Sequence, residues 1–164
     1  MLVSGHLGVG YLVYAAFRRV VGWVRPDRLV ILAVCVGALF PDLVDKPLAW
    51  ELGILASGRS LGHSLLTATV VILLVMPIAA EYDRVDAGAA FSLGYLSHIA
   101  ADAYTAVLAS GSTTFLFWPL GPWSVWEGGL WVPPQYSLAV NWTVLVVALG
   151  VWLLEGAPGL GRVG

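Results

Sequence analysis

Charged residues are scarce in this chain, because Lys, Arg, Asp and Glu make up only 11% of its 164 residues and the formal net charge is −2. So few basic residues exclude the positively charged face that a nucleic-acid-binding protein needs. Hydrophobic residues make up 59% of the chain, and the mean hydropathy is +0.86. This composition lies outside the range of ordinary soluble domains and predicts a polytopic membrane protein.

Cysteine is nearly absent as well, since Cys35 is the single one in the sequence. A lone cysteine excludes a disulfide within the chain, and its apolar neighbours predict a buried free thiol. No Lys or Arg precedes the first apolar run, whereas Arg18 and Arg19 follow it, which is the reverse of a signal peptide. Internal repeats and long linkers are also lacking, so we expect one integral membrane domain over residues 1–164.

Five apolar segments predict an all-α fold, a membrane bundle of about five helices. The first two segments, 7–17 and 29–40, are short, and the second is expected to end before Pro41. The other three are long enough to cross a bilayer and lie at about 64–80, 87–109 and 137–154.

Between the last two segments lies a stretch that prolines and glycines interrupt too often for a spanning helix. It is rich in tryptophan, with Trp118, Trp123, Trp126 and Trp131. Tryptophan suits the headgroup layer, so we expect an outer loop lying in the membrane interface. This loop is either an aromatic anchor or a lid that admits lipid-like substrates from the side.

Most basic residues fall on one side of such a bundle, namely Arg18, Arg19, Arg25, Arg28, Arg84 and Arg162. The positive-inside rule makes that side cytoplasmic. We therefore expect a multi-pass protein of the cell (inner) membrane, with its N-terminus outside and its C-terminus in the cytoplasm. Counting about 1.5 Å per helical residue from the cytoplasmic face places all three histidines in the outer half of the membrane.

The fourth apolar segment contains His98 and Asp102, whose spacing of four residues places them on one helix face, one turn apart. Ionisable side chains are costly inside a bilayer, and a shared cation is the simplest compensation. Other segments bring further groups of the same kind to a similar depth. The six candidate metal ligands are His6, Asp42, Asp45, His63, His98 and Asp102.

Purely structural roles are the alternatives: a hydrogen bond between His98 and Asp102, a polar residue near a helix start for His63, and capping by the two aspartates after Pro41. Three imidazoles and three carboxylates exceed what one tetrahedral zinc with an open position requires. Either two metal ions share the site, or one ion takes the ligands His63, His98, Asp102 and one aspartate of positions 42 and 45. The mixed nitrogen and oxygen set favours zinc, with manganese or iron as alternatives.

Arg59 precedes His63 by four residues, and an arginine beside a metal suits a phosphate group. Its alternative role is that of a solvated loop residue.

The order of these motifs is the most specific feature of the chain. It comprises His6 before a glycine-rich segment, Pro41-Asp-Leu-Val-Asp45, Arg59-Ser-Leu-Gly-His63-Ser64, Gly94-Tyr-Leu-Ser-His98-Ile-Ala-Ala-Asp102, and Trp118-Pro119. This pattern, over about residues 1–120, resembles the YdjM-like family of membrane-bound metal-dependent hydrolases. The family often has His-Arg-Gly-x-Thr-His-Ser before the middle histidine, and here Gly58 and Gly62 stand in place of the first histidine and the threonine. The order is also similar to that of zinc-dependent phospholipases C and single-strand nucleases, which implies phosphoester chemistry.

The resemblance implies a membrane-embedded metal-dependent hydrolase that acts on a lipid or lipid-linked phosphoester through metal-activated water. Asp42 and Asp45 would orient or deprotonate the water, and Arg59 would stabilise charge on the phosphoryl oxygens. A divalent-metal transporter or sensor is one alternative, although transport favours polar residues on both sides of a site and an internal repeat, and neither is visible. A non-catalytic membrane scaffold with a structural metal is the other.

Overall fold

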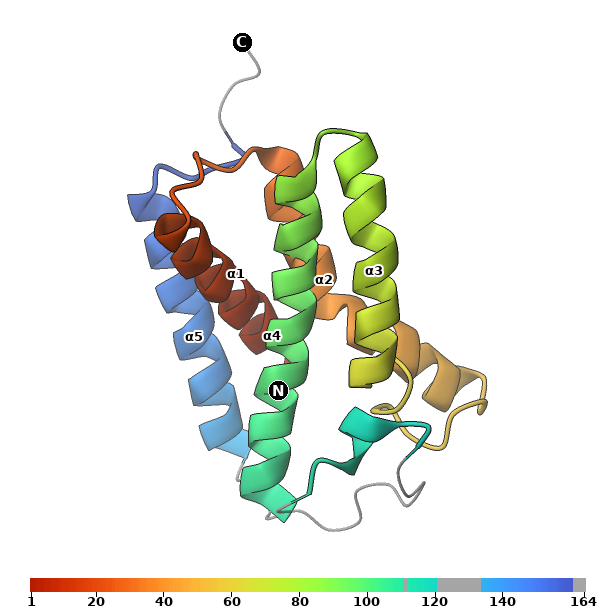
Figure 1. Ribbon diagram of the computed structural model, residues 1–164. Helices are drawn as coiled ribbons and strands as arrows, with labels where there is room; N and C mark the ends of the chain where they lie inside the picture. The colour runs from red at the N-terminus through yellow and green to blue at the C-terminus, as the bar shows by residue number, and fades with distance from the viewer. Residues whose placement is uncertain (111, 121–133, 161–164) are drawn as a thin grey trace.

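Five α-helices form the computed structural model of the protein, which describes residues 1–110, 112–120 and 134–160 and has no strand in those ranges (Figure 1). The helices are α1 (Val3–Val20), α2 (Arg28–Lys46), α3 (Leu65–Glu81), α4 (Val85–Ser110) and α5 (Pro134–Leu154). A π-helical turn, η1 (Pro47–Glu51), follows α2, and a 3-10 turn, η2 (Thr114–Phe117), follows α4. The all-α prediction is therefore confirmed for the described residues.

The first two helices differ from the sequence prediction, which was wrong to make them short. α1 has 18 residues and α2 has 19, against 17 in α3. α2 continues through Pro41, because an internal proline removes one backbone hydrogen bond and neighbouring helices can hold the rest of the helix in place. α1 begins at Val3 because its first turn is packed on α5, where the Leu2 amide donates to Asn141 Oδ1 at 2.9 Å.

Two glycines let α2 and α4 approach closely. A Cβ atom on Gly37 would lie 2.1 Å from the carbonyl oxygen of Phe91, and one on Gly94 would lie 2.4 Å from that of Val34. Small residues at such a crossing allow backbone-to-backbone packing, as is common between membrane helices. The contact joins the middle of α2 to the second and third turns of α4.

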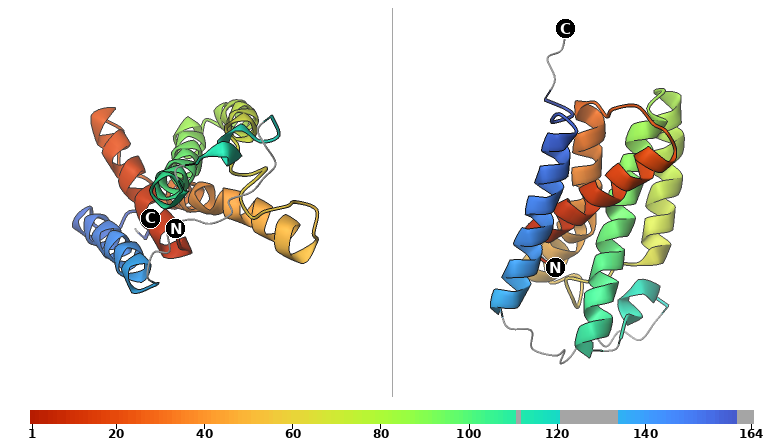
Figure 2. Two further views of the ribbon diagram at one scale, coloured as in Figure 1. Left: turned by 90° about the horizontal axis from the view of Figure 1, so that it is seen from below. Right: turned by 90° about the vertical axis from the view of Figure 1, so that its left-hand side faces the viewer.

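α1 is inclined to the other helices and contacts α2, α4 and α5 (Figure 2). Its glycines make this possible, since a Cβ on Gly8 would lie 2.9 Å from Val144 Cγ1 of α5. The N-terminus lies well inside the length of the bundle in both side views, not at its end (Figures 1 and 2). The first turns of α1 are therefore inside the bundle.

The outer surface of the bundle is apolar, whereas its interior contains small residues, tyrosines and polar groups. In α3, Ala68 is the buried residue, while Leu73 and Leu74 are exposed. Ser137–Leu154 of α5 is the one stretch among the described residues that is long and apolar enough to cross a membrane, and α3 is apolar but shorter. The described residues thus support one of the membrane spans expected from the sequence, and the multi-pass topology stays a prediction.

The end of α1, the start of α2, the α3–α4 turn and the end of α5 all lie at one end of the bundle, which carries most of the arginines (Figure 1). There Glu155 forms ion pairs with Arg18, at 2.5 Å, and with Arg19, and it accepts a hydrogen bond from the Tyr11 hydroxyl at 2.6 Å. Burial raises the pKa of Glu155, but the hydrogen bonds from Arg18 and Tyr11 outweigh burial and hold this pKa below its ordinary value.

Candidate functional site

The structure brings all three histidines and three aspartates together in the interior of the bundle. The site draws on α1 for His6, on α2 for Asp42 and Asp45, on the segment before α3 for His63, and on α4 for His98 and Asp102. Each of the six side chains is at least nine-tenths buried. Their gathering, which was expected from equal depth in the membrane, is what the structure shows.

His63 is oriented by Asp45. Its Nδ1 lies 2.8 Å from Asp45 Oδ2, and because a carboxylate only accepts, Nδ1 carries the proton and Nε2 keeps its lone pair. Asp45 also accepts from the backbone amides of Ser60 and Gly62, both at 2.7 Å, and of His63 at 3.3 Å. Both carboxylate oxygens of Asp45 are therefore taken up by the loop that carries His63.

His98 is oriented in the same way by a backbone group of α2. Its Nδ1 donates to the carbonyl oxygen of Ala38 at 2.7 Å, which leaves the Nε2 lone pair facing the site. The two Nε2 atoms of His63 and His98 are 3.1 Å apart. Two lone pairs at this distance repel each other unless a cation or a shared proton lies between them, so the arrangement fits a metal site.

Asp42 and Asp102 complete a ring of ligand atoms around the two imidazoles. Asp42 Oδ1 lies 3.7 Å from His63 Nε2 and 3.8 Å from His98 Nε2, and Asp102 Oδ2 lies 3.5 Å and 3.9 Å from the same atoms. Ligand atoms about 2.0 to 2.2 Å from a tetrahedral zinc ion lie roughly 3.3 to 3.6 Å from one another. The spacing is therefore close to that of atoms that share one cation.

His6 forms a second group with His98 and Asp102. Its ring stacks on His98 with centroids 3.6 Å apart, and its Nε2 lies 3.4 Å from Asp102 Oδ1. Both ring nitrogens are buried, and neither has a hydrogen-bond partner among the described residues. A buried polar atom without a hydrogen-bond partner costs free energy, so the His6 imidazole is suited to bind a metal ion or an ordered water.

Two cations lie on the more accessible side of the cluster. Lys46 Nζ is 2.5 Å from Asp42 Oδ2, and Arg59 Nε is 2.7 Å from Asp102 Oδ2. The Lys46 and Arg59 side chains are 33% and 26% exposed, whereas the histidine side chains are at most 1% exposed. The α-amino group of Met1 also lies 2.7 Å from Asp102 Oδ1. A ligand that reaches the cluster from the accessible side meets the positive charge of Lys46 and Arg59 first.

The tryptophan-rich loop lies mostly outside the described residues, because Trp123, Trp126 and Trp131 fall within 121–133. Its described beginning packs beside the site. Phe115 of η2 contacts the His63 ring edge-on at 6.1 Å, and the Ser64 hydroxyl donates to the Trp118 carbonyl at 2.6 Å.

Sequence reasoning missed several supporting groups. Asn141 of α5 is buried and holds the start of α1 through the Leu2 amide, and a Cβ on Gly5 would lie 2.0 Å from its Oδ1. The Tyr95 hydroxyl donates to the Gly62 carbonyl at 2.7 Å and so holds the loop beside His63. A buried amide in an apolar span was the signal for Asn141, whereas nothing in the sequence marks the Ala38 carbonyl.

A comparison with curated proteins and with solved structures found no match to this chain. A scan against protein-family models found one that covers almost the whole chain and that describes an inner membrane protein. Residues 1–158 match this model, so the chain belongs to the YdjM inner membrane protein family.

Proposed function

We propose that the protein is a membrane-embedded metal-dependent hydrolase that acts on a lipid or lipid-linked phosphoester. The observation that carries this proposal is the pair of Nε2 atoms of His63 and His98, 3.1 Å apart, with both Nδ1 atoms donating away from the site. This geometry directs the Nε2 atoms of two imidazoles toward one point. Carboxylates of α2 and α4 face the same point, as a cation requires.

The donor set fits a divalent metal, with zinc favoured by the mixed imidazole and carboxylate ligands and manganese or iron as alternatives. His63, His98, Asp42 and Asp102 would hold one ion, because both carboxylates lie near the two Nε2 atoms. His6, which forms a separate group with His98 and Asp102, would belong to a second ion or to the outer shell. When bound, such an ion supplies an activated water nucleophile and polarises a phosphoryl group.

The roles of the two α2 aspartates differ in this proposal. Asp45 lies at the Nδ1 atom of His63, whereas Asp42 and Asp102 lie at the Nε2 atoms, so in this proposal Asp45 orients His63 and is not a direct ligand or the base expected from the sequence. Asp42 keeps Oδ1 toward the histidines while Oδ2 pairs with Lys46, so it is the carboxylate placed to bind the ion or to accept a proton.

The substrate class follows from charge and surroundings. Lys46 and Arg59 place two cations on the accessible side, and a guanidinium binds phosphate oxygens in a bidentate manner. Exposed apolar side chains adjoin this side, including Trp50 and Leu43. A phosphoester attached to a lipid meets both requirements, with its anionic group at the cations and its chains along the apolar surface.

We also propose a multi-pass topology with the site toward the outside and the C-terminus in the cytoplasm. Support comes from the arginines of α1, of the start of α2 and of the α3–α4 turn, which share the end of the bundle away from η1 (Figure 1). The histidine cluster then lies in the outer half of the membrane.

Elemental analysis of the purified protein tests the metal site, and two phosphodiesters test the activity. The wild type should contain zinc or another divalent ion, His98→Ala should lose it, and the exposed-residue control Glu81→Gln should keep it. A chelator should stop hydrolysis of both a long-chain phospholipid and bis(p-nitrophenyl) phosphate, with the larger loss of absolute rate for the phospholipid. Added zinc should restore both rates. Full metal content in His98→Ala would overturn the site, and bound zinc with no hydrolysis of either ester would favour the transporter or scaffold alternative.

A further inference from the structure

Asn141 is a buried amide within the apolar stretch of α5. The stretch Ser137–Leu154 is long and apolar enough to cross a membrane and contains no charged residue, and Asn141 is only 2% exposed. A buried amide costs free energy unless its polar atoms have partners. None of the six candidate ligands lies on α5, so the proposed function gives this helix no part in the site.

Both polar atoms of Asn141 have partners, and one of these partners belongs to α1. Nδ2 donates to the Ser137 carbonyl one turn earlier at 2.6 Å, and Oδ1 accepts from the Leu2 amide at 2.9 Å. Leu2 precedes α1 as its N-cap residue, and its own side chain makes no capping hydrogen bond. Asn141 thus supplies from α5 the acceptor that the glutamate of a capping box supplies within a single helix.

The contact with Asn141 leads directly to His6. The Leu2 carbonyl accepts a hydrogen bond from the His6 amide at 3.1 Å. Gly5, the neighbour of His6, lies against Asn141, because a Cβ atom on this glycine would be 2.0 Å from Asn141 Oδ1. Asn141 therefore fixes the turn of backbone that carries His6.

The placement of the backbone matters more for His6 than for the other two histidines. Asp45 holds Nδ1 of His63, and the Ala38 carbonyl holds Nδ1 of His98. Neither ring nitrogen of His6 has a hydrogen-bond partner among the described residues. Its ring stacks on that of His98 with centroids 3.6 Å apart, so its position depends on this stacking and on the backbone of α1.

We propose that Asn141 is a positioning residue for His6. Through the first turn of α1, it places the His6 imidazole beside His98 and Asp102, the two residues with which His6 can share an ion. The part of this inference that concerns the ion rests on the proposed function, whereas the placement of His6 does not.

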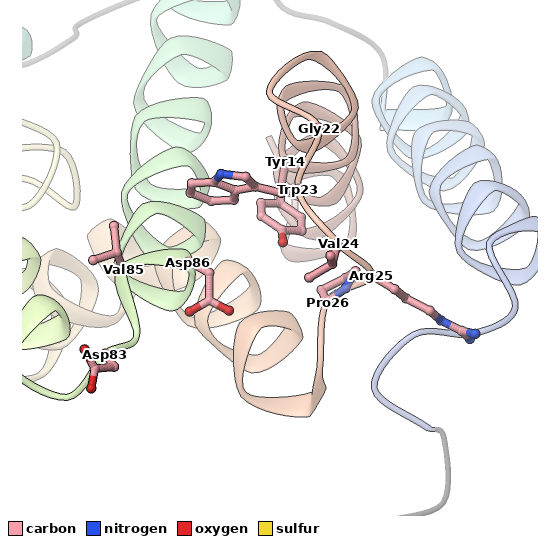
Figure 3. A pocket seen from close by; sticks show the side chains of 9 residues that line it. All are labelled: Tyr14, Gly22, Trp23, Val24, Arg25, Pro26, Asp83, Val85 and Asp86. Carbon is pink, nitrogen blue, oxygen red and sulfur yellow. The ribbon is translucent and has the colours of Figure 1, made fainter.

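The other end of α5 has its own attachments to α1 and to the α1–α2 connection. Glu155 pairs with Arg18 at 2.5 Å. Arg25 donates to the carbonyl of Gly156, and Figure 3 shows this side chain extended toward the end of α5 and away from the hollow beside the α1–α2 connection. Loss of the Asn141 hydrogen bond should therefore free the start of α1 and leave α5 in place.

Histidine-selective 15N NMR of the full chain in detergent, with and without added zinc, tests the placement. The sequence has three histidines, so His6→Ala identifies the signals of His6. Asn141→Leu removes the acceptor at similar size and should shift or broaden the His6 imidazole signals, while those of His63 stay nearly unchanged. Asn141→Asp keeps an oxygen beside the Leu2 amide and should preserve the wild-type His6 signals.

Two further variants complete this experiment. Ser92→Ala, the matched control, removes a buried hydroxyl that bonds within α4, and it should leave the His6 signals as in the wild type. Gly5→Ala disturbs the contact with Asn141 from the α1 side and should shift the His6 signals as Asn141→Leu does. It keeps the test decisive if Asn141→Leu does not fold.

Competition with a chromophoric chelator measures whether Asn141 acts through His6. Asn141→Leu should weaken zinc binding about tenfold, and the double variant with His6→Ala should bind zinc no more weakly than His6→Ala alone. Unchanged His6 signals in Asn141→Leu and Gly5→Ala overturn the proposal. So do wild-type zinc affinity in Asn141→Leu and losses that multiply in the double variant. Absence of zinc from the wild type would instead refute the metal site of the proposed function, and the His6 signals would still decide the placement.

Discussion

Asp45→Asn should weaken zinc binding without removing a zinc ligand. The carboxylate of Asp45 is fully buried and holds His63 through its Nδ1 at 2.8 Å, while the opposite nitrogen of the ring points into the site. Asparagine keeps the shape of aspartate but replaces one acceptor oxygen with a donor and removes the negative charge. The substitution therefore changes the orientation and basicity of His63, and leaves the ligand set unchanged.

The structure decides which oxygen is replaced. An NH2 group at the Oδ2 position would face three donors: the amides of Ser60 and His63 and the Nδ1 of His63. At the Oδ1 position it faces the Gly62 amide alone, so the side chain should adopt this orientation. One buried amide then lacks an acceptor, which costs about 1 to 3 kcal/mol of folding free energy. Loss of an outer partner of a ligating histidine lowers metal affinity about 10- to 100-fold, and we expect the low end because an oxygen still faces Nδ1.

Competition with a chromophoric chelator measures the affinity, and elemental analysis measures the stoichiometry. Asp45→Asn should bind zinc about tenfold more weakly at unchanged stoichiometry, and Asp45→Ala should lie nearer 100-fold. Glu51→Gln in η1 is an exposed control and should match the wild type. Complete loss of zinc in Asp45→Asn would make Asp45 a direct ligand, and wild-type affinity in both Asp45 variants would refute the orienting role.

Three further predictions concern the fold and its orientation. Gly94→Ala should lower the melting temperature, because the new Cβ would lie 2.4 Å from a backbone carbonyl oxygen that no side-chain rotation can move. Overpacking of this kind costs about 1 to 3 kcal/mol of folding free energy. Gly150→Ala, where the Cβ would have nothing within 4 Å, is the control. Glu155 has a lowered pKa in the folded state, so its stabilisation is present above its ordinary pKa of 4.5 and is lost as the pH falls through the lower folded value. Glu155→Gln should remove that part of the pH dependence of thermal unfolding in detergent, and an unchanged acid limb would contradict the assignment. On a Cys35→Ala background, an impermeant thiol reagent added outside intact cells should label Trp50→Cys and should not label Tyr82→Cys. Both positions are exposed. Labelling of Tyr82→Cys but not of Trp50→Cys would contradict the proposed orientation.

Hydropathy located the five helices because each contains an apolar run, but it misplaced the ends of the first two. α1 starts four residues before the predicted segment, since Asn141 and the glycine-lined contact with α5 compensate the polar first turn. α2 extends past Pro41, because the last turns of α2 pack against α4. Both extensions contain polar residues whose cost is offset by partners distant in sequence, and a local window does not include those partners.

The candidate site was predictable as a set of residues, and less so as a set of roles. The four-residue spacing of His98 and Asp102 and the common depth of the histidines were enough to group six side chains. Their roles depend on which oxygen lies beside which donor, and this is decided by the loop 60–63. Sequence spacing treats Asp42 and Asp45 as equivalent, whereas the loop donates to Asp45 and Lys46 pairs with Asp42.

Gly62 shows why the departure from the family pattern at this position is compatible with an intact site. A Cβ there would lie 2.8 Å from the Pro41 carbonyl oxygen and 3.3 Å from Asp45 Oδ1. The loop before α3 therefore packs directly on the last turns of α2, and this close approach is what brings three backbone amides within reach of one carboxylate. A threonine at this position would have to push the loop outward and lengthen those hydrogen bonds. In this chain Gly62 lets the loop lie close enough to α2 for Asp45 to hold His63. A threonine side chain would need space that the α2 backbone occupies.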